Sequence, residues 1–260
     1  MIGKLQQLQL NNLKTDEWRW FQVKPKAKLM KRILLILIFL LPAFFIDAQP
    51  IKVMLVTGGH SFDTKEFFEM FDALEGVEYD HFEQPNANEK LVKDLAEDYD
   101  VLVFYDMWQK ISDKEKAAYI KLTEKGKPFL FLHHSIVSYQ NWDKFEEIVG
   151  GKYVEKGPRV PDESLSTYDH DVWVYSKVEN YTPVTNGLRD LRFFDEVYGN
   201  VRVSDDVTPL LKTKHPKSME VIAWQHNFNA SKIVYLQPGH DKRTYVEPDY
   251  RKLLLQSIQY

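Results

Sequence analysis

The sequence predicts an α/β protein of three layers, in which a doubly wound, mostly parallel sheet carries helices on both faces and the second half is less regular. Strand and helix patterns alternate from Ile51 to Leu132, which favours right-handed strand–helix–strand units. Two apolar strand segments end at histidines, and open α/β sheets bind ligands outside the carboxyl ends of their strands. With 260 residues, 44% of them hydrophobic and 28% charged, the chain is long enough for one large core.

Four strands and three helices are expected in the first half. The strands are apolar runs rich in β-branched or aromatic residues: Ile51–Thr57, Val77–Phe82, Asp100–Tyr105 and Phe129–Leu132. Apolar residues at helical spacing from Phe67 to Leu74 indicate the first helix, and a short second helix is expected near Glu89–Ala96. The third begins at a capping box formed by Ser112 and Glu115 and ends at Gly126.

The second half of the chain has a weaker pattern. Residues 150–170 are rich in glycine, proline and charges, which is typical of loops. Later strands are expected at Asp171–Val178, Val207–Thr213, Glu220–Trp224 and Lys232–Gln237. A final helix starts near Pro248 and carries apolar residues as far as Ile258.

The N-terminal region has the pattern of a signal peptide at residues 30–48. Met30-Lys31-Arg32 is followed by an apolar run and by Ala48 before Gln49. The run of about 13 residues is shorter than the roughly 20 that a membrane span needs. Residues 1–29 are therefore interpreted as a misannotated extension, and 49–260 as a mature domain exported to the periplasm or the extracellular space. A buried N-terminal helix and an uncleaved anchor are the alternatives.

Composition excludes several kinds of chemistry. The chain has no cysteine, which removes disulfides, thiolate nucleophiles, cysteine-ligated metals and a lipoprotein anchor. The net charge of −4 gives no general attraction to nucleic acid. After cleavage of the signal, no membrane partner is expected. The oligomeric state stays open, a homo-oligomer included.

The first candidate site residues follow strand ends in the first half. His60 lies in a Gly58-Gly59-His60 turn that matches neither a dinucleotide fingerprint nor a phosphate loop, so it is either a ligand contact or an ordinary turn residue. His133 and His134 follow the fourth strand, where at least one should line the cleft. Ser135 lacks the context of a nucleophile elbow, which disfavours acyl chemistry.

The second half adds acidic and histidine candidates. If the segment around Glu196 is extended, Glu196 and Tyr198 share one face and Asp195 points to the other. Glu196 is then a general acid or base, or else part of a solvated charge pair. His240 and Asp241 end a later strand, where a carboxylate can orient an imidazole.

Other histidines are assigned to the surface or to structural roles: His81, His170, His215 and His226. A divalent metal is an open alternative, because His60, His133 and His240 could converge with Glu196 in one cleft. The chain has no His-Glu-x-x-His motif or comparable short spacing, so the sequence does not define such a metal site.

The order and spacing of several segments resemble the ThuA-like domain of trehalose utilisation. The matching segments are Val53–His60, Gly126–Ser135, Ile148–Tyr153, Thr182–Leu188, Phe194–Tyr198, Ile222–Trp224 and Val234–Asp241. The resemblance spans about Lys52 to Tyr260 and implies a class I glutamine amidotransferase-like, flavodoxin-type fold. Amidotransferase activity is not implied, since the elbow cysteine of that superfamily is missing.

The chain departs from the family pattern at three places, which affects loop geometry and substrate choice rather than the fold. Tyr181-Thr182 stand where members often have histidine, Asn229–Lys232 replace a Gly-Lys-Gly-Arg turn, and Tyr260 replaces a terminal tryptophan.

The resemblance implies a small-molecule sugar substrate, trehalose or a related or oxidised sugar, in a cleft lined by histidine and glutamate. The expected catalytic residues are Glu196, His240 and His133. The expected substrate-binding residues are His60, His134, Tyr198, Trp224, Trp142 and Asp241. A non-catalytic sugar-binding module and a structural or partner-binding domain are the alternatives.

Overall fold

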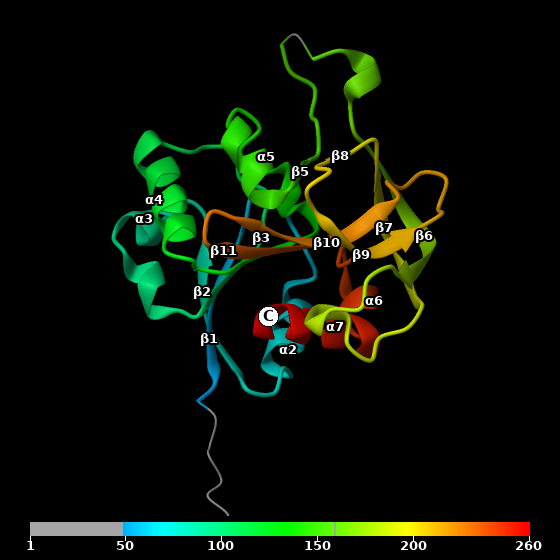
Figure 1. Ribbon diagram of the computed structural model, residues 1–260, viewed down its shortest axis with the longest axis horizontal. Coiled ribbons are helices and arrows are strands. Elements are labelled where there is room, and N and C mark those ends of the chain that lie inside the picture. The colour runs from blue at the N-terminus through cyan, green and yellow to red at the C-terminus, as the bar shows by residue number, and fades with distance from the viewer. Residues whose placement is uncertain (1–48, 159) are drawn as a thin grey trace, which may run out of the picture. The chain divides into compact units, whose positions relative to one another are not determined.

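A computed structural model describes residues 49–158 and 160–260 (Figure 1). The expected signal peptide and the segment before it lie outside these residues, so both stay predictions. Within the described part of the chain, none of the helices combines the length and the apolar character that a membrane crossing requires.

A sheet of nine strands runs through the molecule in the order β2-β1-β3-β4-β11-β10-β9-β6-β7. The first five strands in this order are parallel to one another, and the remaining four pair antiparallel. The parallel strands are β2 (Val77–Glu83), β1 (Ile51–Gly58), β3 (Val101–Asp106), β4 (Phe129–Leu132) and β11 (Ser231–Leu236). The antiparallel strands are β10 (Val221–Phe228), β9 (Thr208–Thr213), β6 (Thr167–Val178) and β7 (Leu191–Gly199). A separate short pair joins β5 (Gly151–Lys152) to β8 (Arg202–Val203).

Helices cover both faces of the sheet, as the three-layer prediction requires (Figure 1). One face carries α3 (Asn86–Val92), α4 (Asp113–Glu124) and α5 (Asp143–Val149). The other carries α2 (Thr64–Asp72), α6 (Lys242–Tyr245) and α7 (Pro248–Gln259). The α/β class is therefore confirmed, and the less regular second half consists mainly of antiparallel strands. The predicted capping box at Ser112 and Glu115 is present at the start of α4.

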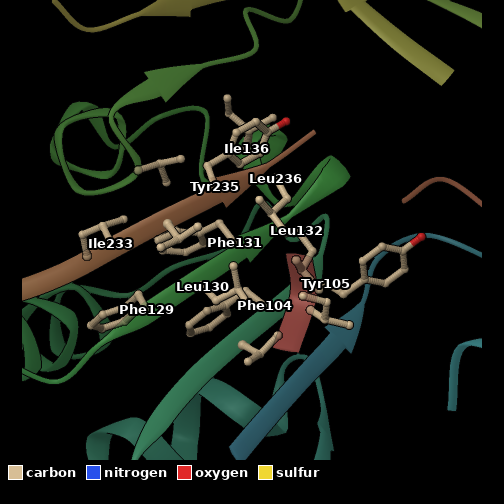
Figure 2. Packing of buried hydrophobic residues seen from close by; sticks show 14 of the residues in the cluster. Phe104, Tyr105, Phe129, Leu130, Phe131, Leu132, Ile136, Ile233, Tyr235 and Leu236 are labelled. Carbon is tan, nitrogen blue, oxygen red and sulfur yellow. The ribbon is translucent and has the colours of Figure 1, made fainter. Parts of the chain in front are cut away.

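Side chains that alternate along the central strands fill the core on each side. Phe104 of β3 stacks on Phe131 of β4, with ring centroids 5.2 Å apart, beneath α4 and α5 (Figure 2). The next residue, Tyr105, points to the opposite face and stacks on Phe67 of α2 at 4.5 Å. Alternation with a period of two thus anchors a helix on each face of one strand.

A buried polar cluster lies behind the carboxyl end of β3. Asp106 is 1% exposed and accepts a hydrogen bond from the Gln84 amide at 2.9 Å. The Gln84 amide also contacts Asn88 and the hydroxyl of Tyr139. Burial raises the pKa of the Tyr139 hydroxyl above its ordinary value. Burial raises the pKa of Asp106 to about 7 because a carboxylate is costly in a dry environment, although its hydrogen bonds oppose this.

We expect this carboxyl to make the protein less stable as the pH rises from about 4 to about 8. The folded state holds the proton up to a pH of about 7, whereas the unfolded state releases it near its ordinary pKa, so ionisation of the folded form costs stability across that interval. Asp106→Asn should reduce this slope and be the more stable form at pH 8, by up to a few kcal/mol. The free energy of unfolding in urea would be measured at pH 5, 6.5 and 8 for the wild-type protein and for Asp106→Asn. Asp205→Asn is the control, because Asp205 is exposed. If the free energy of unfolding changed equally with pH in the wild type and both variants, the raised pKa would not belong to Asp106.

Candidate active site

Three chain segments meet at the carboxyl end of the parallel strands. β4 and β11 are paired in parallel, and Leu132 lies opposite Leu236 in the register. The residues that follow both strands, His133 and Gln237, are therefore neighbours. The antiparallel half of the sheet brings β7 against this end, where the Gln237 side-chain amide contacts the carbonyl of Glu196 at 2.5 Å.

His133 is fully buried and is held in a defined orientation. Its backbone has φ of 47°, in the left-handed region, so the chain turns sharply as it leaves β4. The ring Nδ1 lies 2.6 Å from the carbonyl oxygen of Gln237, which can only accept, so Nδ1 carries a proton. Nε2 faces the Tyr198 hydroxyl at 2.9 Å, His240 Nδ1 at 3.2 Å and Glu196 Oε1 at 3.3 Å.

Glu196 is the buried carboxylate of the site, with 8% of its side chain exposed. Besides His133, its Oε2 lies 2.7 Å from His170 Nδ1 and 3.7 Å from His240 Nδ1. Three imidazoles therefore surround one carboxylate. Burial opposes its charge, but the hydrogen bond and the charge of His133 outweigh burial and hold the pKa of Glu196 below its usual value.

The pKa values of the two neighbouring histidines shift in opposite directions, although burial lowers both. Burial disfavours the imidazolium of His133, yet the hydrogen bond and charge of Glu196 outweigh it and raise the pKa of His133. For His240, burial and the nearby positive charge of His133 lower the pKa. Positive charge in this pair is therefore favoured on His133, which is next to Glu196, and disfavoured on His240.

Asp195 points to the opposite side of β7 and fixes the loop that carries His240. Its Oδ1 accepts from the backbone N–H groups of Glu196 at 2.8 Å and His240 at 3.0 Å. Its Oδ2 accepts from the N–H of Gly239 at 2.7 Å and the hydroxyl of Thr244 at 2.8 Å. Gly239 has φ of 123°, and a Cβ there would lie 2.3 Å from the Tyr250 hydroxyl, so the turn before His240 requires glycine.

A cavity of about 290 Å³ opens in front of this cluster. Its walls contain four histidines, two glutamates and several aromatic residues: His60, Met107, His133, His134, Val137, Tyr153, Glu155, Tyr168, His170, Glu196 and Tyr198. His134 is 3% exposed, and neither ring nitrogen has a hydrogen-bond partner among the described residues. Burial, and then the charge of His133, hold the pKa of His134 well below its ordinary value, so its ring is neutral.

The structure brings most of the predicted site residues together. His60, His133, His134, Glu196 and Tyr198 line the cavity. His240 lies directly behind, in contact with His133.

Three other predicted substrate contacts are placed away from the cavity. Trp224 is fully buried, and its indole N–H donates to the carbonyl of Val149, so it belongs to the core. Trp142 packs on Tyr119 and Phe145 beside α4 and α5. Asp241 caps α6 and pairs with Arg243.

Six of the wall residues were not among the predicted site residues, and two of these six are a histidine and a glutamate. His170, assigned to the surface or a structural role, has 47% of its side chain exposed and also contacts Glu196. It lies on β6 where the pairing with β7 is interrupted between Asp169 and Val172, an irregularity that residue periodicity does not reveal. Glu155 belongs to the loop after β5, and partial burial raises its pKa. Its only sequence signal was its place in a loop-rich segment.

Comparisons with known proteins give one family and a set of similar structures. A family model described as ThuA, trehalose utilisation, matches residues 52–260. No curated protein sequence matches the chain.

Two of the similar crystal structures are described as ThuA-like. The first, from Parabacteroides merdae ATCC 43184, has 17% identity and a TM-score of 0.66 over 81% of this chain and 89% of that one. The second, from Bacteroides uniformis ATCC 8492, has 20% identity and a TM-score of 0.63 over 83% and 93%. A cytoplasmic protein from Salmonella typhimurium LT2 has 8% identity and a TM-score of 0.57 over 80% and 98%. At these identities the structures show a shared fold.

Proposed function

This chain belongs to the ThuA family, described as trehalose utilisation, and from that premise we propose that it acts on a carbohydrate in the cavity at His133 and Glu196. The substrate class is trehalose or a related or oxidised sugar. Glu196, His133 and His240 are the catalytic groups. The observation that carries the proposal is a buried carboxylate surrounded by three imidazoles at the wall of a cavity.

The size and walls of the cavity suit a sugar ring. Its volume of about 290 Å³ is near the lower end of the range of about 300–1,000 Å³ for ligand pockets, which favours a single ring over a whole disaccharide. The aromatic rings of Tyr153 and Tyr168 offer apolar faces to the sugar. The exposed ring of His60 offers hydrogen bonds to hydroxyl groups.

The catalytic groups are arranged for proton exchange with a bound sugar. Glu196 reaches the cavity from β7, and His133 lies beside it within hydrogen-bonding distance. A carboxylate and an imidazole so placed can accept a proton from one sugar oxygen and return it to another. The Tyr198 hydroxyl contacts His133 Nε2 and keeps the ring in place.

The direct test is conversion of a sugar by the purified protein. Trehalose, glucose and their keto derivatives would be incubated with the protein, and products would be followed by NMR and mass spectrometry. We expect one of these sugars to be converted. If none is converted but one binds, the protein is a sugar-binding module, and if none binds, a structural or partner-binding role replaces the proposal.

Tyr168 at the mouth of the cavity provides a prediction for substrate binding. Its ring is 61% exposed, and Tyr168→Ala should remove one aromatic face without disturbing the core. We expect KM to rise by about fivefold with kcat nearly unchanged, because the variant loses the binding free energy of one aromatic contact. Tyr181→Ala is the matched control, because Tyr181 is 77% exposed and is not a cavity wall residue. An equal effect of both variants would argue against Tyr168 as a sugar contact.

We also propose that the protein is exported, on the basis of the signal-peptide pattern at residues 30–48. The first strand begins at Ile51, so cleavage before Gln49 leaves β1 whole. Expression in a Gram-negative host followed by intact-mass measurement of each cell fraction tests this. We expect a periplasmic or secreted chain that starts at Gln49, and a cytoplasmic chain that retains residues 30–48 would refute export.

A further inference from the structure

The three side chains at the centre of the site present ligand atoms at the corners of a small triangle. His133 Nε2, a carboxylate oxygen of Glu196 and His240 Nδ1 all lie within 4.8 Å of one another. His133 Nε2 lies 3.2 Å from His240 Nδ1 and 3.3 Å from Glu196 Oε1, whereas His240 Nδ1 is 3.7 Å from the other carboxylate oxygen, Oε2. Ligands bonded at about 2.0–2.1 Å to a tetrahedral zinc ion are roughly 3.3–3.4 Å apart, so the two contacts of His133 Nε2 have the spacing of edges of such a tetrahedron.

The surroundings fix each of these groups in the orientation that metal ligation needs. His133 Nδ1–H donates a hydrogen bond to the Gln237 carbonyl, which leaves the lone pair of Nε2 directed into the triangle. The backbone of His240 is fixed by Asp195. His170 lies against Glu196 Oε2 and orients the carboxylate from outside the triangle. Outer contacts of this kind accompany most histidine and carboxylate ligands.

The chemistry of the triangle favours one central cation. A single hydrogen shared between His133 and one neighbour satisfies one of the three contacts. A divalent ion at the centre bonds to all three donors at once. Two imidazoles and one carboxylate are a set that zinc accepts readily, and the cavity beside His133 and Glu196 gives access to a fourth position.

We propose that His133, Glu196 and His240 bind a divalent transition-metal ion, with zinc as the first choice, whose open position faces the cavity. His60, a predicted metal candidate, is outside this group and is a cavity wall residue. The site itself stands on these three side chains alone. Its role in catalysis rests on the proposed function, in which a bound ion would polarise a sugar oxygen or activate a water molecule.

The number of metal ions bound per chain tests the proposal and requires no sugar. The full-length protein would be treated with chelator, incubated with zinc chloride and desalted. Its metal content would then be measured by inductively coupled plasma mass spectrometry. We expect about one zinc per chain, a higher Tm with zinc, and loss of at least nine-tenths of the metal in His240→Ala. His226→Gln is the matched control, since His226 is a partly buried histidine that contacts the Ile148 carbonyl, and it should keep full zinc content.

Each outcome decides one question. Less than about one-tenth of an equivalent of zinc, cobalt or manganese in the wild-type protein would overturn the metal site, as would equal zinc in His240→Ala and wild type. Circular dichroism checks the fold of the variant, and His240→Gln serves in its place if the alanine variant unfolds. Sugar conversion by the chelated protein would refute the role of the ion in catalysis and keep the proposed function. Stoichiometric zinc with no sugar bound or converted would do the reverse.

Discussion

Glu196→Gln is expected to lower sugar turnover by about 100- to 10,000-fold while the protein stays folded. Glutamine has nearly the shape of glutamate, so the packing against His133 and His170 is kept. It cannot carry the negative charge that the surrounding imidazoles neutralise. Whether Glu196 moves a proton or holds an ion, the reacting group is lost in this variant.

The measurement is kcat with the converted sugar, alongside the free energy of unfolding in urea. The matched control is Glu179→Gln, which removes the charge of a surface glutamate that pairs with Lys212. We expect the control to keep full kcat and both proteins to unfold within about 1 kcal/mol of wild type. A Glu196→Gln protein with wild-type kcat would remove Glu196 from the catalytic machinery.

Asp195→Ala is expected to produce the largest loss of stability. The change leaves four donors without their acceptor: the N–H groups of Glu196, Gly239 and His240 and the hydroxyl of Thr244. A buried group without its partner costs about 1–3 kcal/mol, and some of these donors will find water, so a total of about 3–5 kcal/mol is expected. That is a large part of the roughly 5–15 kcal/mol that stabilises a typical domain.

Urea unfolding measures this effect, with Asp205→Ala as the control, since Asp205 is exposed and its loss should cost less than about 0.5 kcal/mol. Asp195 acts as a positioning residue, so any folded Asp195→Ala protein should also show reduced kcat because His240 is no longer held. A stability loss below about 1 kcal/mol would show that the four hydrogen bonds are not needed to hold the loop.

The parallel half of the fold could be predicted because its signals are local. Buried parallel strands such as Val101–Asp106 and Phe129–Leu132 are apolar along nearly their whole length, and histidine follows the second of them directly. The path of β7 could not be predicted, because its neighbours in the sheet depend on antiparallel pairing between distant segments. Trp224 illustrates the same limit, since an aromatic residue in a strand has the same local pattern whether it faces a ligand or the core.

The candidate site was predictable where one rule applied. His133 and His240 follow neighbouring parallel strands. Parallel strands end at the same edge of a sheet, so the two residues are expected to lie close together. Glu196 was selected by alternation along an extended segment. His170 was missed because its place beside Glu196 depends on an irregular pairing in β6, which is a property of two strands together.

The position of β11 determines when the candidate site can form. This strand is near the C-terminal end of the chain, yet it lies between β4 and β10 and joins the parallel half of the sheet to the antiparallel half. Until it is in place, the halves share no strand pairing and His133 has no neighbour in Gln237. A chain that ends before Ser231 would lack both the link and His240. The candidate site is therefore assembled only when the fold is complete.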